Sequence, residues 1–151
     1  MKSYDEVKFI LSDIEPTETM FGKFTQEDIP NLQEILKEPE PWLASRAVFA
    51  ISKFNTAHTN EILHQLVDDP RVEIRVSLAS CVNKLSLRGY RKIISKLIED
   101  KEIGVRKFAY ESVLPNASLT FIKQLKKVYK KEDVPYLKEV LSKKISEFDE
   151  R

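Results

Sequence analysis

Glycine is scarce in this chain, with only three among 151 residues. Strand-rich folds and phosphate-binding loops need glycine where the backbone turns sharply or approaches a ligand closely. The scarcity therefore favours a helical protein. Long apolar runs are missing too: none reaches the roughly 18 residues that a membrane-spanning helix requires. We therefore expect no membrane partner.

The side chains of nucleophilic catalysis and metal binding are also few. Cys81 is the single cysteine, so no internal disulfide can form and nothing calls for an oxidising compartment. His58 and His64 are six residues apart, which is a poor spacing for one helix face. No zinc-ligand set, Walker-type loop or Gly-x-Ser-x-Gly motif occurs. We therefore expect no enzyme, no metal site and no cofactor, and we expect Cys81 to be a buried packing residue.

The N-terminal residues do not resemble a secretory signal. Met1 to Glu6 are followed by a short apolar stretch that contains charges, whereas a signal peptide has an uninterrupted apolar region. The expected location is the cytoplasm.

Charge is unevenly distributed, although the net charge of the chain is only +1. Residues 1–75 carry 8 Lys and Arg against 14 Asp and Glu, a net charge of −6. Residues 76–151 carry 17 against 10, a net charge of +7. Such asymmetry either orients a charged partner or simply keeps the two ends of the molecule solvated.

The strongest pattern is an internal repeat with a period of 31 residues. When rows of this length are aligned without gaps, Glu38, Asp69 and Asp100 share a column. Other columns are mostly apolar: Leu32, Leu63 and Ile94; Ile35, Leu66 and Leu97; Leu36, Val67 and Ile98; Leu43, Ile74 and Val105; Ala47, Leu78 and Ala109; Ala50, Cys81 and Ser112; Ile51, Val82 and Val113. Their spacings of three and four predict helices with one buried face.

Each row therefore predicts two amphipathic helices joined by a short turn. The first helices are expected around residues 27–38, 60–68 and 90–99, and the second around 40–53, 70–85 and 101–114. Proline in the turn suits the start of the second helix, and the acid before it is expected to cap that helix. A short connection makes the two helices antiparallel.

The ends of the chain extend this pattern. A fourth, degraded pair is expected over residues 117–148, with Lys131 in the acidic column and Leu137 in the arginine column described below. Residues 3–14 are predicted to form a capping helix, with Val7, Ile10, Leu11 and Ile14 on one side. The domain prediction is a cap and linker over residues 1–25, followed by a repeat array over 26–151.

The rows "DDPRVEIRVSLASCV" and "EDKEIGVRKFAYESV" resemble HEAT-like repeats of the short kind found in phycobilisome-lyase-type proteins. In both, an arginine follows the acid after six residues: Arg75 follows Asp69, and Arg106 follows Asp100. The first repeat departs from the pattern, because Ala44 stands in the arginine column. The resemblance implies an all-α fold, namely an α-solenoid of three to four HEAT-like hairpins. It also implies that Asp69, Arg75, Asp100 and Arg106 form a structural ladder between repeats.

In that family the second helices usually line the concave surface, so the resemblance implies that a partner would bind there. Trp42, Arg46, Phe49 and Lys53 are spaced four, three and four residues apart and share one helix face. Phe108 lies on the corresponding face of the third repeat. Large aromatic and arginine side chains dominate protein interfaces. These residues are the predicted partner-binding anchors, and a monomeric adaptor for a protein partner is the predicted function.

Three alternatives remain open. The aromatic face of the first repeat is instead covered by residues 15–25, where Met20, Phe21 and Phe24 stand in a polar linker. A second possibility is a nucleic-acid-binding module that uses Lys123, Lys127 and Lys130 against phosphates. The resemblance alone adds a third, a lyase-like accessory protein.

Overall fold

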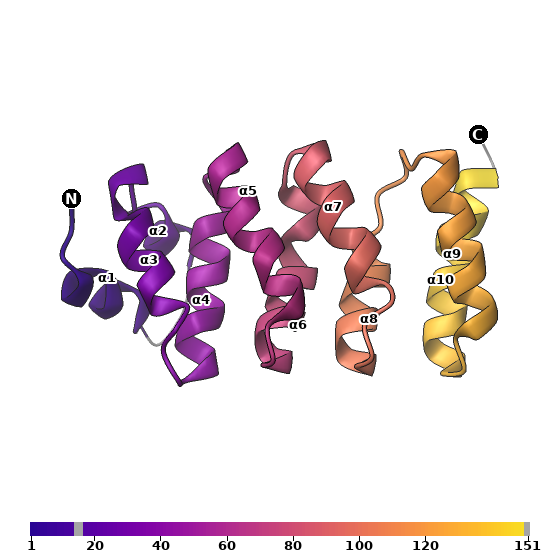
Figure 1. The fold of residues 1–151 in the computed structure, drawn as a ribbon, viewed down its shortest axis with the longest axis horizontal. Helices are drawn as coiled ribbons and strands as arrows, with labels where there is room; N and C mark the ends of the chain where they lie inside the picture. The colour runs from indigo at the N-terminus through magenta and orange to yellow at the C-terminus, as the bar shows by residue number, and fades with distance from the viewer. Residues whose placement is uncertain (14–16, 150–151) are drawn as a thin grey trace.

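The computed structural model of the chain describes residues 1–13 and 17–149, and it contains no β-strand among them (Figure 1). The all-α prediction is confirmed. The α-helices are α1 (Tyr4–Leu11), α2 (Glu18–Phe21), α3 (Ile29–Ile35), α4 (Pro41–Ser52), α5 (Ala57–His64), α6 (Val72–Cys81), α7 (Leu87–Leu97), α8 (Ile103–Glu111), α9 (Leu119–Lys131) and α10 (Pro135–Asp149). Short 3-10 helices η1 (Gln26–Asp28), η2 (Gln65–Asp68) and η3 (Val82–Lys84) adjoin α3, α5 and α6.

Four helix pairs of the described residues stand in a row, with α1 beside the first pair and α10 in the last pair at the opposite end (Figure 1). The pairs are α3 with α4, α5 with α6, α7 with α8, and α9 with α10. Each pair packs mainly on the next one along the chain, as repeats in a solenoid do. The predicted α-solenoid is therefore confirmed.

One apolar seam runs through the whole row. Leu63, Val82 and Leu97, which the period places inside, are fully buried. The core continues without a break from Val7 in α1 to Phe148 in α10. Because each pair contributes one side of this seam, no pair buries its own apolar face alone.

The second helix of each pair packs more closely on its neighbours than the first helix does. Contacts are close along the series α4, α6, α8 and α10. Among the first helices, only α5 and α7 approach each other comparably. The second helices therefore form the tighter, inner layer of the array, and α3, α5, α7 and α9 form the outer layer.

The turns differ from the prediction in how they use their prolines and acids. Pro70 lies before α6, which begins at Val72, so it does not start the helix. Asp69 accepts a hydrogen bond from the backbone N–H of Arg71 (2.9 Å), two residues on, and Asp100 does the same for Glu102 (3.0 Å). The acids thus stabilise the turn and leave the helix N-terminus uncapped by a side chain.

The N-terminal helix is confirmed as α1, which begins with a capping box between Ser3 and Glu6. Its buried side chains are Val7 and Leu11, and Ile10 is half-buried. The predicted role of Ile14 falls outside the described residues. The sequence pattern did not predict the short helix α2, whose Met20 is buried.

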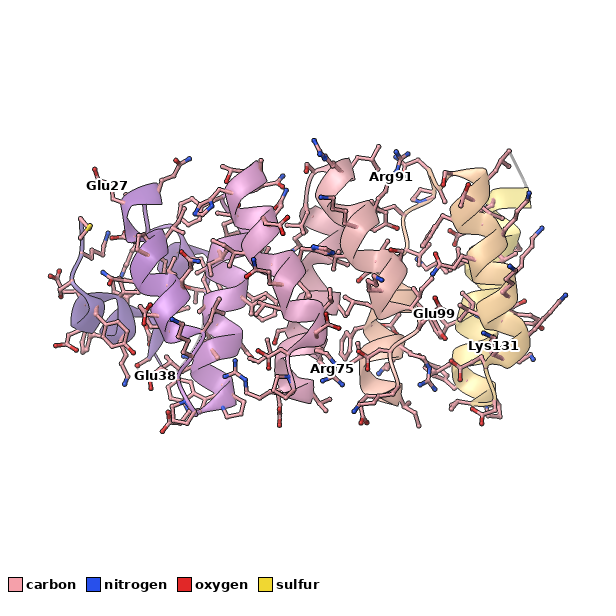
Figure 2. All side chains as sticks on the ribbon, in the orientation of Figure 1. Glu27, Glu38, Arg75, Arg91, Glu99 and Lys131 are labelled. Atoms are coloured by element: carbon pink, nitrogen blue, oxygen red, sulfur yellow. The ribbon has the colours of Figure 1, made fainter. Side chains whose placement is uncertain are left out.

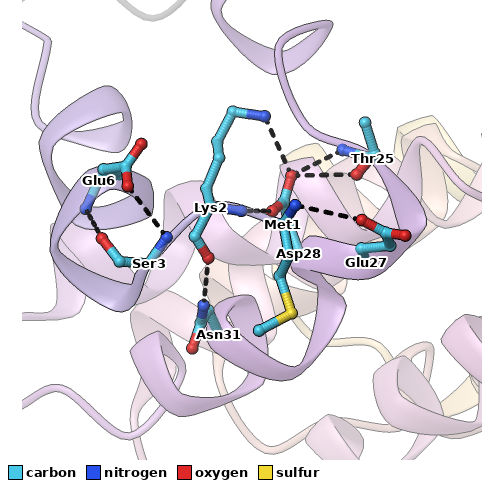
Figure 3. Close-up of polar contacts among 8 residues, drawn as sticks. All are labelled: Met1, Lys2, Ser3, Glu6, Thr25, Glu27, Asp28 and Asn31. Atoms are coloured by element: carbon cyan, nitrogen blue, oxygen red, sulfur yellow. Dashed lines mark hydrogen bonds and ion pairs between the residues drawn. The ribbon is translucent and has the colours of Figure 1, made fainter.

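Asp28 ties the first residues of the chain to the array (Figure 3). Its fully buried carboxylate accepts hydrogen bonds from the backbone N–H of Lys2 (2.9 Å), from Lys2 Nζ (3.2 Å) and from the backbone N–H of Thr25 (2.8 Å). Asn31 donates to the Lys2 carbonyl (2.8 Å). These bonds outweigh the effect of burial, which alone would raise the pKa of Asp28, and they hold that pKa below its usual value.

Candidate functional site

A ladder of ion pairs joins neighbouring repeats. It runs along the edge of the array that is formed by the turns within the helix pairs. Arg75 donates through Nε and Nη2 to the Asp100 carboxylate of the next repeat (2.9 and 3.2 Å) and through Nη1 to the Asp69 carbonyl (2.7 Å). Both side chains of the pair are almost buried, at 6% and 8% exposure. Arg75 therefore holds α6 against the following turn, which is a structural role. Figure 2 shows its place in the row.

The next link of the ladder contains an acid that the sequence pattern missed. Arg106 donates to Glu132 (2.9 and 3.2 Å) and to the Asp100 carbonyl (3.1 Å), and the Tyr110 hydroxyl also donates to Glu132 (2.6 Å). The predicted fourth-repeat register, with Lys131 in the acidic column, is therefore wrong by one residue. The extra residue lies where α9 runs on to Lys131, and it moves every later position, so Leu137 is a core residue and not the arginine equivalent.

The first repeat lacks the ladder arginine, and two other sets of contacts replace it. Arg71 pairs with Asp69 (3.0 Å) and reaches back to the carbonyls of Glu38 (2.9 Å) and Leu36 (2.6 Å) in the preceding repeat. Glu38 accepts hydrogen bonds from Tyr4 and from Lys8 (3.0 Å) of α1. Ala44 in the arginine column was the signal that Asp69 needed another partner.

The N-terminal segment occupies most of the predicted anchor face on α4. Arg46 donates to the Leu11 carbonyl (2.7 Å) and to the Asp13 carbonyl, and its guanidinium lies 5.2 Å from the centre of the Trp42 ring. Lys53 donates to the Glu18 carboxylate of α2 (2.8 and 2.9 Å).

An aromatic contact completes this cover. Phe21 of α2 packs against Phe49, with ring centres 6.5 Å apart. Arg46, Phe49 and Lys53 thus serve the N-terminal cover, as the first alternative from the sequence proposed. Trp42 remains 51% exposed at the edge of the covered area.

Along the rest of the array, the inner layer presents a row of exposed and half-buried side chains to solvent. We call it the inner face and define it by the positions four, eight and eleven residues after each ladder acid. Apart from Arg46 and Phe49, which the N-terminal segment covers, and Ser77, which is only 7% exposed, its residues are Trp42, Glu73, Ser80, Gly104, Phe108, Glu111, Tyr136, Val140 and Lys143. Tyr136 is 55% exposed and occupies the same repeat position as Trp42, an equivalence that only the corrected register reveals. Half-buried Phe108 lies between them in sequence order, with Lys107 Nζ 5.5 Å from its ring centre.

The lysines of the nucleic-acid alternative lie in the other layer. Lys123, Lys127 and Lys130 are all exposed on α9. Their spacing of four and three residues places them on one helix face. They are therefore separate from the aromatic residues of the inner face.

Catalytic and metal chemistry find no geometric support in the described part of the chain. Cys81 is 2% exposed, and burial raises the pKa of its thiol to about 11. His64 lies near Glu61 (3.9 Å), its neighbour on α5, and no group of three or more His, Cys, Asp or Glu in residues 1–13 and 17–149 is arranged to hold a metal ion. No helix in these ranges combines the length and hydropathy needed to cross a bilayer.

Comparison with solved structures places the fold. A designed armadillo repeat protein, YIII(Dq.V1)4CPAF in complex with peptide (KR)4, superposes with a TM-score of 0.55 at 13% sequence identity. The match covers 94% of this chain and 80% of that chain. The chain is a helical-repeat solenoid. No family model and no curated protein matches the sequence of this solenoid.

Removing one partner of the ladder should be far more damaging than removing an exposed ion pair. Arg106→Ala leaves the Glu132 carboxylate, whose side chain is 1% exposed, without its cation. We expect a loss of roughly 3–5 kcal/mol in the free energy of unfolding, measured with urea. Lys143→Ala, which removes an exposed pair with Glu139, should change it by less than about 1 kcal/mol. Equal losses would contradict a structural role for the ladder.

The ionised Glu132 carboxylate makes the stability of the protein depend on pH. Burial alone would raise the pKa of Glu132, but hydrogen bonds from Arg106, Tyr110 and Val134 outweigh it and lower that pKa below 4.5. A lowered folded-state pKa stabilises the protein above the unfolded value and loses this effect as pH falls through the folded value. The stability advantage over Glu132→Gln should therefore be largest at neutral pH and shrink below about pH 4.5. A difference independent of pH would exclude this role.

Cys81 should react with alkylating reagents only in the unfolded protein. The thiolate is the reactive form, and both burial and the raised pKa suppress it. We expect iodoacetamide labelling at about pH 8 to proceed no faster than global unfolding, with the urea-unfolded chain as the reference. Rapid labelling of the native protein would instead indicate an accessible nucleophile.

Proposed function

We propose that this solenoid is a non-catalytic scaffold that binds an extended segment of a partner protein along its inner face. The observation that carries the proposal is the placement of aromatic side chains on that face. Trp42 and Tyr136 are half exposed at equivalent positions of the first and last repeats, with Phe108 between them in the third. Exposed aromatic residues with nearby cations are typical anchors of protein interfaces.

The architecture supports an extended partner. Neighbouring packed helices lie about 8–10 Å apart, so the path from α4 to α10 spans roughly 24–30 Å. A strand-like segment rises about 3.3 Å per residue, so this path corresponds to about seven to nine residues. Because the ladder fixes the spacing of the helices, the face is formed before the partner arrives and needs little ordering on binding. The structural neighbour with its peptide agrees with this mode.

The ladder also supports a finer assignment, that the repeats are of the HEAT-like class. The pairs of Arg75 with Asp100 and of Arg106 with Glu132 join consecutive repeats, as that resemblance implies. In HEAT-like repeats the second helices usually form the binding side. The exposed aromatic residues on the inner layer of this solenoid agree with that expectation.

A selection experiment tests the proposal directly. Peptides selected from a random library against the folded protein should lose at least about tenfold in affinity with Tyr136→Ala or Trp42→Ala. Leu119→Ala, at a 78% exposed position of the outer layer, is the matched control and should have no effect. Selected peptides whose affinity is the same for the wild type and for both aromatic variants would refute binding on the inner face.

A further inference from the structure

The outer layer carries an unusually one-sided charge over α7 and α9. Neither helix contains an acidic residue within Leu87–Leu97 or Leu119–Lys131. Six exposed cations form what we call the basic ridge: Arg88, Arg91, Lys92, Lys123, Lys127 and Lys130. Figure 2 shows Arg91 on α7, on the side that looks toward α9.

The charge of the basic ridge is not used within the fold. Among the ion pairs of the described residues, none involves a member of the ridge. The ladder arginines Arg71, Arg75 and Arg106, by contrast, are each held by a carboxylate. The ridge therefore presents an unneutralised positive field, which attracts an acidic partner and speeds its approach.

A small apolar cavity opens between the two helices of the ridge. Its volume is about 180 Å³, and its mainly apolar lining includes Tyr90, Ile94, Ala117 and Phe121, with Arg91 beside them. Gln124 bridges the helices below it by donating to the Ser95 carbonyl (2.8 Å) and to Glu99 (3.0 Å). The cavity exists because α7 and α9 do not pack as closely as α5 and α7.

The ridge cavity, at about 180 Å³, is comparable in size to cavities that bind small aromatic molecules. An apolar cavity of about 150 Å³ is large enough for benzene. The ridge cavity therefore has room for one aromatic or large aliphatic side chain.

We propose that the basic ridge binds an acidic protein segment that inserts one such side chain into this cavity. The carboxylates of the segment would meet Arg91, Lys123 and Lys127 around it. This surface belongs to the outer layer, so the inference does not depend on the inner face binding anything.

The apolar cavity favours an acidic protein over a nucleic acid. Phosphates would satisfy the cations, but a sugar-phosphate backbone has no apolar group to fill the cavity. Bases need exposed aromatic rings to stack on. On the described α7 and α9, Tyr90 is buried, and Phe121 and Tyr129 are half-buried.

Fluorescence anisotropy with two labelled peptides tests the proposal. Both are rich in aspartate and glutamate and carry one central residue, phenylalanine in one and alanine in the other. The phenylalanine peptide should bind at least about tenfold more tightly. Ala117→Leu, which fills the cavity, should abolish this difference, whereas Ser142→Leu on α10 should preserve it.

The charge requirement has its own matched variants. The triple variant Arg91→Gln, Lys123→Gln and Lys127→Gln should weaken both peptides at least about tenfold. The control, Lys23→Gln, Lys37→Gln and Lys101→Gln, removes the same charge from exposed positions outside both proposed binding surfaces and should leave binding unchanged. Thermal unfolding of every variant checks that it folds.

Three results would overturn the inference. One is that neither peptide binds the wild-type protein. Another is that the two peptides bind equally, or that Ala117→Leu leaves their difference intact, since the cavity would then have no role. The third is that a mixed-sequence DNA duplex binds more tightly than the phenylalanine peptide, which would assign the ridge to nucleic acid.

Discussion

The burial of a shared apolar seam is the constraint on which this structure depends. A pair of short helices exposes too much apolar surface to be stable alone, so each pair needs a neighbour on at least one side. The seam from Val7 to Phe148 meets that need along the whole chain. Helix α1 and the segment through α2 supply the missing neighbour at the N-terminal end. The folded state is therefore the sum of neighbouring interfaces, and no repeat is autonomous.

Electrostatics then divides the molecule into parts with different tasks. At the turns, Arg71, Arg75 and Arg106 form ion pairs with carboxylates and donate hydrogen bonds to carbonyls. These contacts fix the spacing of the helices in the inner layer. On α7 and α9 the cations have no carboxylate partner in the described structure and face solvent. The same residue types thus act as scaffold in one layer and as a candidate recognition surface in the other. Aromatic residues on the inner face add a third, largely uncharged kind of surface.

Much of the fold could be predicted from the sequence because its repeat is regular. The columns at spacings of three and four identified the buried faces, and the acid and arginine six residues apart identified the ladder. The fourth repeat failed because one extra residue near Lys131 moved Glu132 and Tyr136 out of their columns. Aligning rows without gaps cannot detect such a shift, whereas the burial of Leu137 and Leu141 reveals it.

The candidate site was harder to predict because it depends on contacts between distant segments. Arg46, Phe49 and Lys53 share a helix face, and that spacing alone suits a partner or a cover equally well. Only the positions of Phe21 and Glu18 decide between them. The ridge cavity was not predictable either, since it arises from how far apart α7 and α9 lie.

Hydrogen exchange resolved to individual helices tests the shared seam most directly. Amides in α6 and α8, which pack on neighbours at both sides, should exchange most slowly, and those in α1 and α10 at the ends should exchange fastest. This gradient follows if stability is the sum of neighbouring interfaces. Equal protection in all four helix pairs, or the slowest exchange at an end of the row, would contradict the account.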